Sequence, residues 1–283
     1  MTLQEQGVPR ADWANPGLAR PTSPLASLVG FLDKTATIAE LEARKLRHDP
    51  TELITRAVQP ALWLLVFGQV FNQVRAIPTG DLRYIDFMAP GILAQSVLFI
   101  AIFYGIAVIW ERDLGILQKF LVSPTPRTAI VLGKALSAGV RSLSQAVIIY
   151  ILTLLLGVHL NWNPLALLGV LGIVLLGAAF FSTFSLIIAC LVKTRERFMG
   201  IGQVLTMPLF FASNAIYPIA IMPPWLQAIS HVNPLTYEVD ALRALMLANG
   251  TSAYGLGVDY AVLIVALAVL VVIAGRLYPN VAA

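Results

Sequence analysis

The sequence contains few charged residues. Asp, Glu, Lys and Arg together make up 12% of its 283 residues, whereas 58% are hydrophobic. A soluble domain carries roughly 25% charged residues, so lipid is expected to be the solvent for much of this chain. The single cysteine, Cys190, excludes an intrachain disulfide and a multi-cysteine metal site. Because Cys190 lies in an apolar run, we interpret it as a small buried residue.

The sequence also lacks the short motifs of nucleotide-binding and hydrolytic proteins. It has no G-x-x-x-x-G-K-[ST] phosphate loop, no H-E-x-x-H and no G-x-S-x-G. The histidines, His48, His159 and His231, are far apart in the sequence, which argues against a metal site. No cluster of acidic residues lies within the apolar runs, which argues against a proton-driven pump. We therefore expect no catalytic residue, metal ion or cofactor in this chain.

Six apolar segments, each long enough for a bilayer core of about 20 residues, predict six membrane-spanning helices. They are expected at 55–74, 87–110, 129–158, 164–192, 199–217 and 257–277. The predicted fold is therefore an all-α polytopic membrane protein, with a six-span domain over 51–283. Residues 1–27 are expected to form a disordered cytoplasmic tail, and 28–50 an amphipathic helix in the membrane interface.

The segment 218–250 differs from an ordinary outer loop. It is apolar, yet prolines interrupt it repeatedly. A loop exposed to water should not be this apolar, so we expect a re-entrant pair of short helices that dips into the outer leaflet. Such a segment is tolerated only where protein or a cavity receives its backbone.

The basic residues are distributed asymmetrically over this topology. With both termini in the cytoplasm, 15 of the 19 basic residues lie on inside segments. These are Arg10, Arg20, Lys34, Arg44, Lys45, Arg47, Arg56, Arg112, Lys119, Arg127, Lys134, Lys193, Arg195, Arg197 and Arg276. Arg75, Arg83 and Arg243 lie outside, and Arg141 lies near the inner boundary. The positive-inside rule predicts this bias for an even number of spans in the inner (plasma) membrane, and it explains the net charge of +4 without nucleic acid.

A charged island at 111–127 separates the second and third predicted spans. Its apolar residues recur at helical spacing, and prolines end the pattern. The apolar residues are Ile116, Leu117, Phe120 and Leu121. The pattern predicts a short helix over 111–124, parallel to the membrane. From the pattern alone, its apolar face could equally be buried by a soluble partner or lie on lipid.

Polar and aromatic side chains within the apolar spans mark a possible transport path, because polar groups in lipid tend to face the protein interior or a cavity. They are Gln59, Trp63, Gln69 and Asn72 on the first span, Gln95, Phe99 and Tyr104 on the second, and Phe210, Ser213 and Asn214 on the fifth. The alternative for each polar residue is an ordinary hydrogen bond between helices, worth about 1 kcal/mol or less.

Several short motifs follow one another in a characteristic order. They are Arg47-His48-Asp49-Pro50, Gln59-Pro60, Pro90-Gly91-Ile92, the run from Glu111 through Gly115, Leu117, Ser123 and Pro124 to Arg127, and Asn233-Pro234-Leu235-Thr236-Tyr237 followed by Arg243. Over about residues 46–277, their order and spacing resemble the membrane subunits of ABC-2 (type-2 ABC exporter) permeases. Among these, the chain is most similar to the daunorubicin-resistance-type permeases and their cyanobacterial and plastid relatives.

The resemblance implies the permease subunit of an ATP-driven ABC exporter. Two copies of this chain would pair with two soluble ABC ATPase subunits, which bind the ATP and Mg. The helix at 28–50 would be the family's connecting helix, and 111–124 its coupling helix. The coupling residues would be Glu111, Gly115, Leu117, Phe120, Pro124 and Arg127. The second cytoplasmic loop, 193–197, would be either a smaller ATPase contact or only a charged anchor.

The implied mechanism is alternating access by rigid-body motion. The implied cargo is hydrophobic or amphipathic, such as a drug-like molecule, a lipid or a lipid-linked glycan, so the expected roles include multidrug resistance and lipid or polysaccharide export. The alternative is a membrane-embedded assembly factor or enzyme that acts without an ATPase partner.

Overall fold

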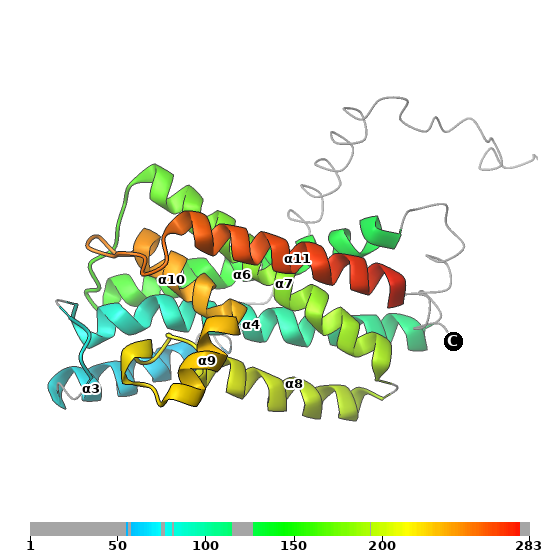
Figure 1. Cartoon of the computed structure of the whole chain (residues 1–283), viewed down its shortest axis with the longest axis horizontal. Helices are drawn as coiled ribbons and strands as arrows, with labels where there is room; N and C mark the ends of the chain where they lie inside the picture. Colours follow the sequence, from blue (N-terminus) through cyan, green and yellow to red (C-terminus); the bar gives the residue numbers. More distant parts are fainter. Residues whose placement is uncertain are drawn as a thin grey trace, which may run out of the picture.

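The computed structural model describes residues 55, 58–74, 77–80, 82–114, 127–192 and 194–277, which form a bundle of helices (Figure 1). No strand occurs among these residues, so the all-α prediction is confirmed for the part of the chain that the structure describes. The predicted tail at 1–27, the predicted helix at 28–50 and most of the predicted coupling helix, 115–124, lie outside the described residues.

Within the part of the chain that the structure describes, four helices are long and apolar enough to cross a membrane. They are α4 (Tyr84–Asp113), α6 (Arg127–Leu155), α7 (Pro164–Leu191) and α11 (Leu256–Leu277). They correspond to the second, third, fourth and sixth predicted spans. The prediction of a polytopic membrane protein is therefore confirmed, and α7 and α11 each agree with the expected bounds to within one residue.

α4 and α6 depart from the expected bounds for local reasons. α4 is three residues longer at each end, because its terminal acidic residues are paired: Asp86 accepts hydrogen bonds from Arg83, and Asp113 from Arg195. α6 ends three residues early, because Gly157 adopts a positive φ of 69°. A glycine in this conformation just after the last turn is a common helix stop.

The first predicted span is an irregular helix over its described part. Helical residues at 58–62 lead into a π-helix, η2 (Trp63–Gly68), and then into α3 (Gln69–Val74). Pro60 lies just before η2 and has no backbone N–H to donate, so the regular α-helical hydrogen bonding is interrupted there.

The fifth predicted span corresponds to α8 (Arg195–Phe211), but the expected bounds, 199–217, were wrong at both ends. Thr194 caps the helix by accepting a hydrogen bond from the backbone N–H of Arg197, so the charged residues 195–197 form a first helical turn rather than a loop. Ser213 ends the helix, because its hydroxyl donates to the carbonyl of Phe210 and accepts from the N–H of Ala215.

α7 lies at the centre of the bundle and packs against α4, α6 and α11. Close approach depends on small residues. A Cβ on Gly169 would lie 2.9 Å from a methyl group of Leu245, and the hydroxyl of Ser185 donates to the carbonyl of Ile102 on α4. Ser185 therefore satisfies its hydroxyl inside an apolar core and ties two long helices together.

The segment predicted to be a pair of short helices has that structure. It contains a 3-10 turn, η3 (Ile219–Ile221), followed by α9 (Pro224–Val232) and α10 (Pro234–Met246). Two of the prolines that interrupt the sequence, Pro224 and Pro234, occupy the first positions of α9 and α10, where a missing N–H costs nothing. α10 packs against α4, α7 and α11, and both helices lie toward the end of the bundle that holds α3 (Figure 1).

Candidate functional site: a polar cavity at mid-helix

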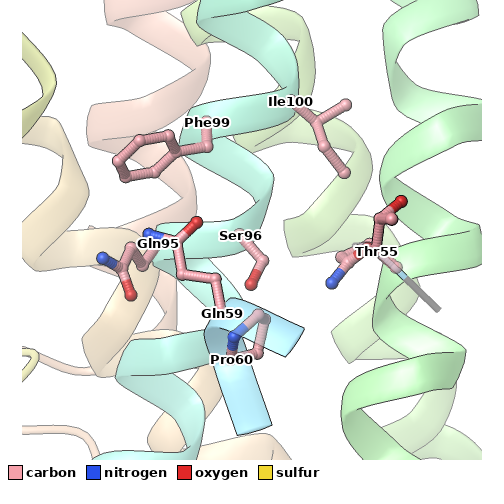
Figure 2. A pocket seen from close by; sticks show the side chains of 8 residues that line it. Thr55, Gln59, Pro60, Gln95, Ser96, Phe99 and Ile100 are labelled. Atoms are coloured by element: carbon pink, nitrogen blue, oxygen red, sulfur yellow. The ribbon is translucent and has the colours of Figure 1, made fainter. Parts of the chain in front are cut away.

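A cavity of about 130 Å³ lies where the first described helix meets the middle of α4 and α6. Its lining includes Gln59, Gln95 and Phe99, which the sequence predicted as part of a transport path. In Figure 2 the side chain of Gln59 lies close to those of Gln95 and Ser96 on α4. Phe99 and Ile100 lie further along α4. Thr55, Pro60 and Gln145 complete the wall. The structure thus brings together three of the predicted path residues.

Gln95 is the central feature of this cavity. It lies midway along the apolar stretch Tyr84–Ile106, and only 3% of it is exposed. Its side-chain Nε2 has no hydrogen-bond partner among the described residues. Burying an amide without a compensating hydrogen bond costs roughly 1–3 kcal/mol. By contrast, Ser96 satisfies its hydroxyl on the carbonyl of Ile92, at 2.8 Å.

A second cavity, of about 280 Å³, lies next to the first along α4 and shares Phe99 and Ile100 with it. Its other lining residues are Phe103, Tyr104 and Arg141. The guanidinium of Arg141 lies 5.8 Å from the centre of the Tyr104 ring, within the range of a cation–π interaction. Arg141, placed near the inner boundary by sequence, therefore contributes to the same lined surface as Phe99 and Tyr104.

The remaining predicted path residues are divided among other places. Trp63 packs edge-on against the buried Phe210, with ring centres 5.8 Å apart, so the pair joins η2 to α8. Gln69 is exposed on α3. Asn72 lines a separate cavity formed with residues 77–80. Ser213 forms the turn after α8, as described above.

Asn214 lines a cavity of about 510 Å³, which we call the outer cavity because the predicted topology places it on the outer side. Its lining includes Pro78, Thr79 and Leu82, the turn after α8, and Thr251, Ala253 and Tyr254. The predicted path residues therefore do not line one continuous space within a single chain.

The motif around Asn233 organises this outer part of the fold, a role that sequence reasoning missed. The Asn233 side chain accepts a hydrogen bond from the N–H of Leu235 and donates one to the carbonyl of Leu209, at 2.7 Å. It therefore caps α10 and anchors it to α8. Tyr237 donates to the carbonyl of His231, which fixes α10 against α9. Only the Asn-Pro pair, a helix-start signal, was readable from sequence.

The other end of the bundle carries an ion pair that links two cytoplasmic segments of the predicted topology. Arg195 at the start of α8 donates to Asp113 at the end of α4, with Nη2 2.7 Å from Oδ2. The same guanidinium lies 3.7 Å from the centre of the Trp110 ring. Sequence reasoning assigned these residues to separate loops. Their opposite charges were the available signal, but nothing in the sequence paired them.

Among the described residues, no group of three or more His, Cys, Asp or Glu side chains is placed to hold a metal ion. Most of the predicted coupling residues lie outside the residues that the structure describes. Glu111 lies in the last turn of α4 and Arg127 begins α6, but their side chains, and all of Gly115, Leu117, Phe120 and Pro124, lie outside the described part.

Apolar helices packed around buried polar cavities define a polytopic membrane protein. Comparison with known proteins identifies its kind: residues 34–247 match the family model of the ABC-2 type transporter. The chain therefore belongs to the ABC-2 type transporter family, and its relatives are membrane transport permease subunits.

The relatives are similar over most of the chain. It is 32% identical over 203 residues to "Putative transport permease ycf38" of Cyanophora paradoxa, which covers 71% of this chain and 70% of that protein. It is 29% identical over 211 residues to "Daunorubicin resistance ABC transporter permease protein DrrB1" of Streptomyces coeruleorubidus, covering 74% and 72%. "Inner membrane transport permease YadH" of Escherichia coli K12 is 26% identical over 198 residues, covering 66% and 73%. The resemblance seen in the sequence motifs is thereby confirmed.

Proposed function

We propose that this chain is the membrane half of an ATP-driven exporter for a hydrophobic or amphipathic cargo, such as a drug-like molecule, a lipid or a lipid-linked glycan. The observation that carries this proposal is the placement of Gln95, a buried amide without a hydrogen-bond partner among the described residues, at the centre of a helix in a transport permease. A polar group in that position is costly unless something occupies the cavity with it.

In the proposed topology, six spans cross the inner (plasma) membrane of the cell, and both termini lie in the cytoplasm. In it, the helix ending at Val74 and α8 cross the membrane beside α4, in addition to the four long helices. Both pack against α4, which supports this arrangement. α9 and α10 are then re-entrant, and the burial of α10 among α4, α7 and α11 supplies the protein environment that a re-entrant backbone needs.

A second copy of the chain is proposed to cover the apolar surface of the first helix and α8. Leu62, Val66 and Phe67 are between 43% and 55% exposed, and on α8 Val204 is 71% exposed. The contact between Trp63 and Phe210 holds these two helices together as one surface. A path between two copies would place the Gln95 cavity, which opens beside the first helix, next to this interface.

Force is proposed to enter through the helix at 111–124, from a soluble ATPase that binds the ATP and Mg. The ion pair between Asp113 and Arg195 supports a route for this force. Because it connects the end of α4 to the start of α8, a displacement of the 111–124 segment would move both helices together. The second cytoplasmic segment then acts as a mechanical link, whether or not it contacts the ATPase.

The test is reconstitution of the chain with its ATPase subunit in proteoliposomes and measurement of ATP-dependent movement of a panel of lipids and drugs. We expect Gln95→Leu to change transport rate and cargo preference while ATP hydrolysis without cargo is kept. Gln73→Leu, the same substitution on an exposed position of α3, is the matched control. Absence of ATP-dependent transport of every compound would favour the alternative of an assembly factor without an ATPase.

A further inference from the structure

The outer cavity of about 510 Å³ contains a buried cation whose charge is not neutralised by an ion pair among the described residues. Arg243 of α10 lines this cavity and is only 7% exposed. Its Nη2 donates to the carbonyl of Asn214 at 2.7 Å and, more weakly, to that of Phe87 at 3.4 Å. The guanidinium lies 3.9 Å from the centre of the Phe87 ring. These contacts fix the position of the group but bring no negative charge to it.

The nearest acidic residue on the same helix is engaged elsewhere. Oδ2 of Asp240 accepts hydrogen bonds from the hydroxyl of Ser252 at 2.8 Å and from the N–H groups of Ala253 and Tyr254 at 2.8 and 3.1 Å. Asp240 therefore holds the segment 252–254 at the mouth of the cavity. Its charge acts on the guanidinium of Arg243 from within the same lining, but its hydrogen bonds among the described residues go to Ser252, Ala253 and Tyr254 and none goes to Arg243. Because a buried charge is normally both paired and fully hydrogen-bonded, the guanidinium keeps the capacity to bind a further anionic group.

Two polar atoms at the cavity remain without hydrogen bonds. Nε of Arg243 and Oδ1 of Asn214 are buried and have no partner among the described residues. Both side chains are more than nine-tenths buried, since Asn214 is 4% exposed. Nε is a donor suited to an anionic oxygen, and the guanidinium geometry matches phosphate or carboxylate. The amide of Asn214 can accept from a hydroxyl next to that anion. The apolar part of the lining, with Leu82 and Ile219, suits a hydrocarbon chain.

We propose that this outer cavity binds the anionic headgroup of an amphipathic molecule, with a phosphate or carboxylate on Arg243 and a neighbouring hydroxyl on Asn214. The site stands apart from the Gln95 cavity and shares no lining residue with it. Cavities of roughly 300–1,000 Å³ are the size of small-molecule sites, so the space fits a headgroup with the start of its chain. The proposal concerns binding alone and holds whether the bound molecule is a bilayer lipid or a cargo on its way out.

The test uses the full chain in neutral detergent without any ATPase, so that its outcome is independent of the proposed export function. Dihexanoyl phosphatidic acid is the probe, and its binding is measured by calorimetry. We expect saturable binding that inorganic phosphate displaces only at much higher concentration, because phosphate lacks the apolar contacts. Displacement by phosphate at equal concentration would identify a site for the free anion rather than for the headgroup, and would overturn the amphipath assignment. Equal binding of neutral dihexanoyl phosphatidylcholine would overturn the anion assignment.

Variants locate the binding. Arg243→Gln should weaken it at least tenfold, whereas Arg276→Gln, the same change on an exposed position at the far end of α11, should leave it unchanged. Because Arg243→Gln also removes two hydrogen bonds to carbonyls, a second variant keeps the test decisive. Ala253→Phe fills the cavity mouth while Arg243 is intact, and should abolish binding in a folded protein. Undiminished binding in Ala253→Phe would show that the probe binds elsewhere.

Discussion

Gly91 on α4 allows the turn after α8 to pack closely against this helix. A Cβ built on this glycine would lie 2.7 Å from Cα and 2.8 Å from Cβ of Ala215, with the Ala215 carbonyl oxygen closer still. Ordinary carbon contacts begin near 3.4 Å, so Gly91→Ala requires the turn after α8 to retreat. Ala215 cannot retreat easily, because the carbonyls on either side of it accept hydrogen bonds from Arg243 and from the hydroxyl of Tyr84.

The magnitude follows from two opposing effects. Overpacking a well-packed core costs typically about 1–3 kcal/mol, and a contact with backbone belongs at the upper end. Replacing glycine by alanine within a helix returns about 0.5–1 kcal/mol. We therefore expect Gly91→Ala to destabilise the chain by about 2 kcal/mol.

Gly133→Ala on α6 is the matched control, because a Cβ there would meet no atom within 4 Å. It should be neutral or stabilising. Equilibrium unfolding in mixed micelles compares the two variants directly. Equal unfolding free energies for Gly91→Ala and Gly133→Ala would refute the close approach of α4 to the 213–216 turn.

Two further predictions concern the ends of the bundle. Asn233→Ala should lower the unfolding free energy by about 1–2 kcal/mol, because it removes the cap of α10 as well as the hydrogen bond to Leu209; the same unfolding assay checks it, and a loss below a few tenths would count against this anchoring role. Asp113→Arg and Arg195→Asp should each reduce ATP-driven transport with little effect on stability, since an ion pair whose side chains are 36% and 38% exposed is worth about 0.2–1 kcal/mol. The double exchange should restore transport, and a double variant no better than the singles would rule out the link.

The sequence predicted most accurately those elements whose limits are set locally. α7 begins at Asn163-Pro164, where the Asn163 side chain accepts from the N–H of Leu165, and an unbroken apolar run carries it to Leu191. α11 likewise follows an apolar run, and its bounds were predicted to within one residue. The ends of α4 were misjudged because Asp86 and Asp113 stay helical through partners, one of them 82 residues away in the sequence. Hydropathy contains no information about such pairs.

For the candidate site, too, the sequence predicted local features but not contacts between distant segments. A polar residue in an apolar span was enough to single out Gln59 and Gln95, and the fold brings them to one cavity. It was not enough to separate them from Gln69, which is exposed on α3. The role of Arg243 depends on its position along α10 and on the backbone carbonyls of Asn214 and Phe87, which belong to two other segments. That arrangement exists only in three dimensions.

The proposed function requires that a separate ATPase drives this chain through the helix at 111–124. Purification of the tagged chain from membranes, together with quantification of any bound ATPase subunit, checks this requirement. We predict that an ATPase co-purifies, that Leu117→Asp combined with Phe120→Asp abolishes its binding, and that Gln118→Asp, on the opposite side of the predicted helix, retains it. Recovery of the chain without an ATPase, or an ATPase that stays bound to the Leu117→Asp, Phe120→Asp variant, would contradict the proposed function.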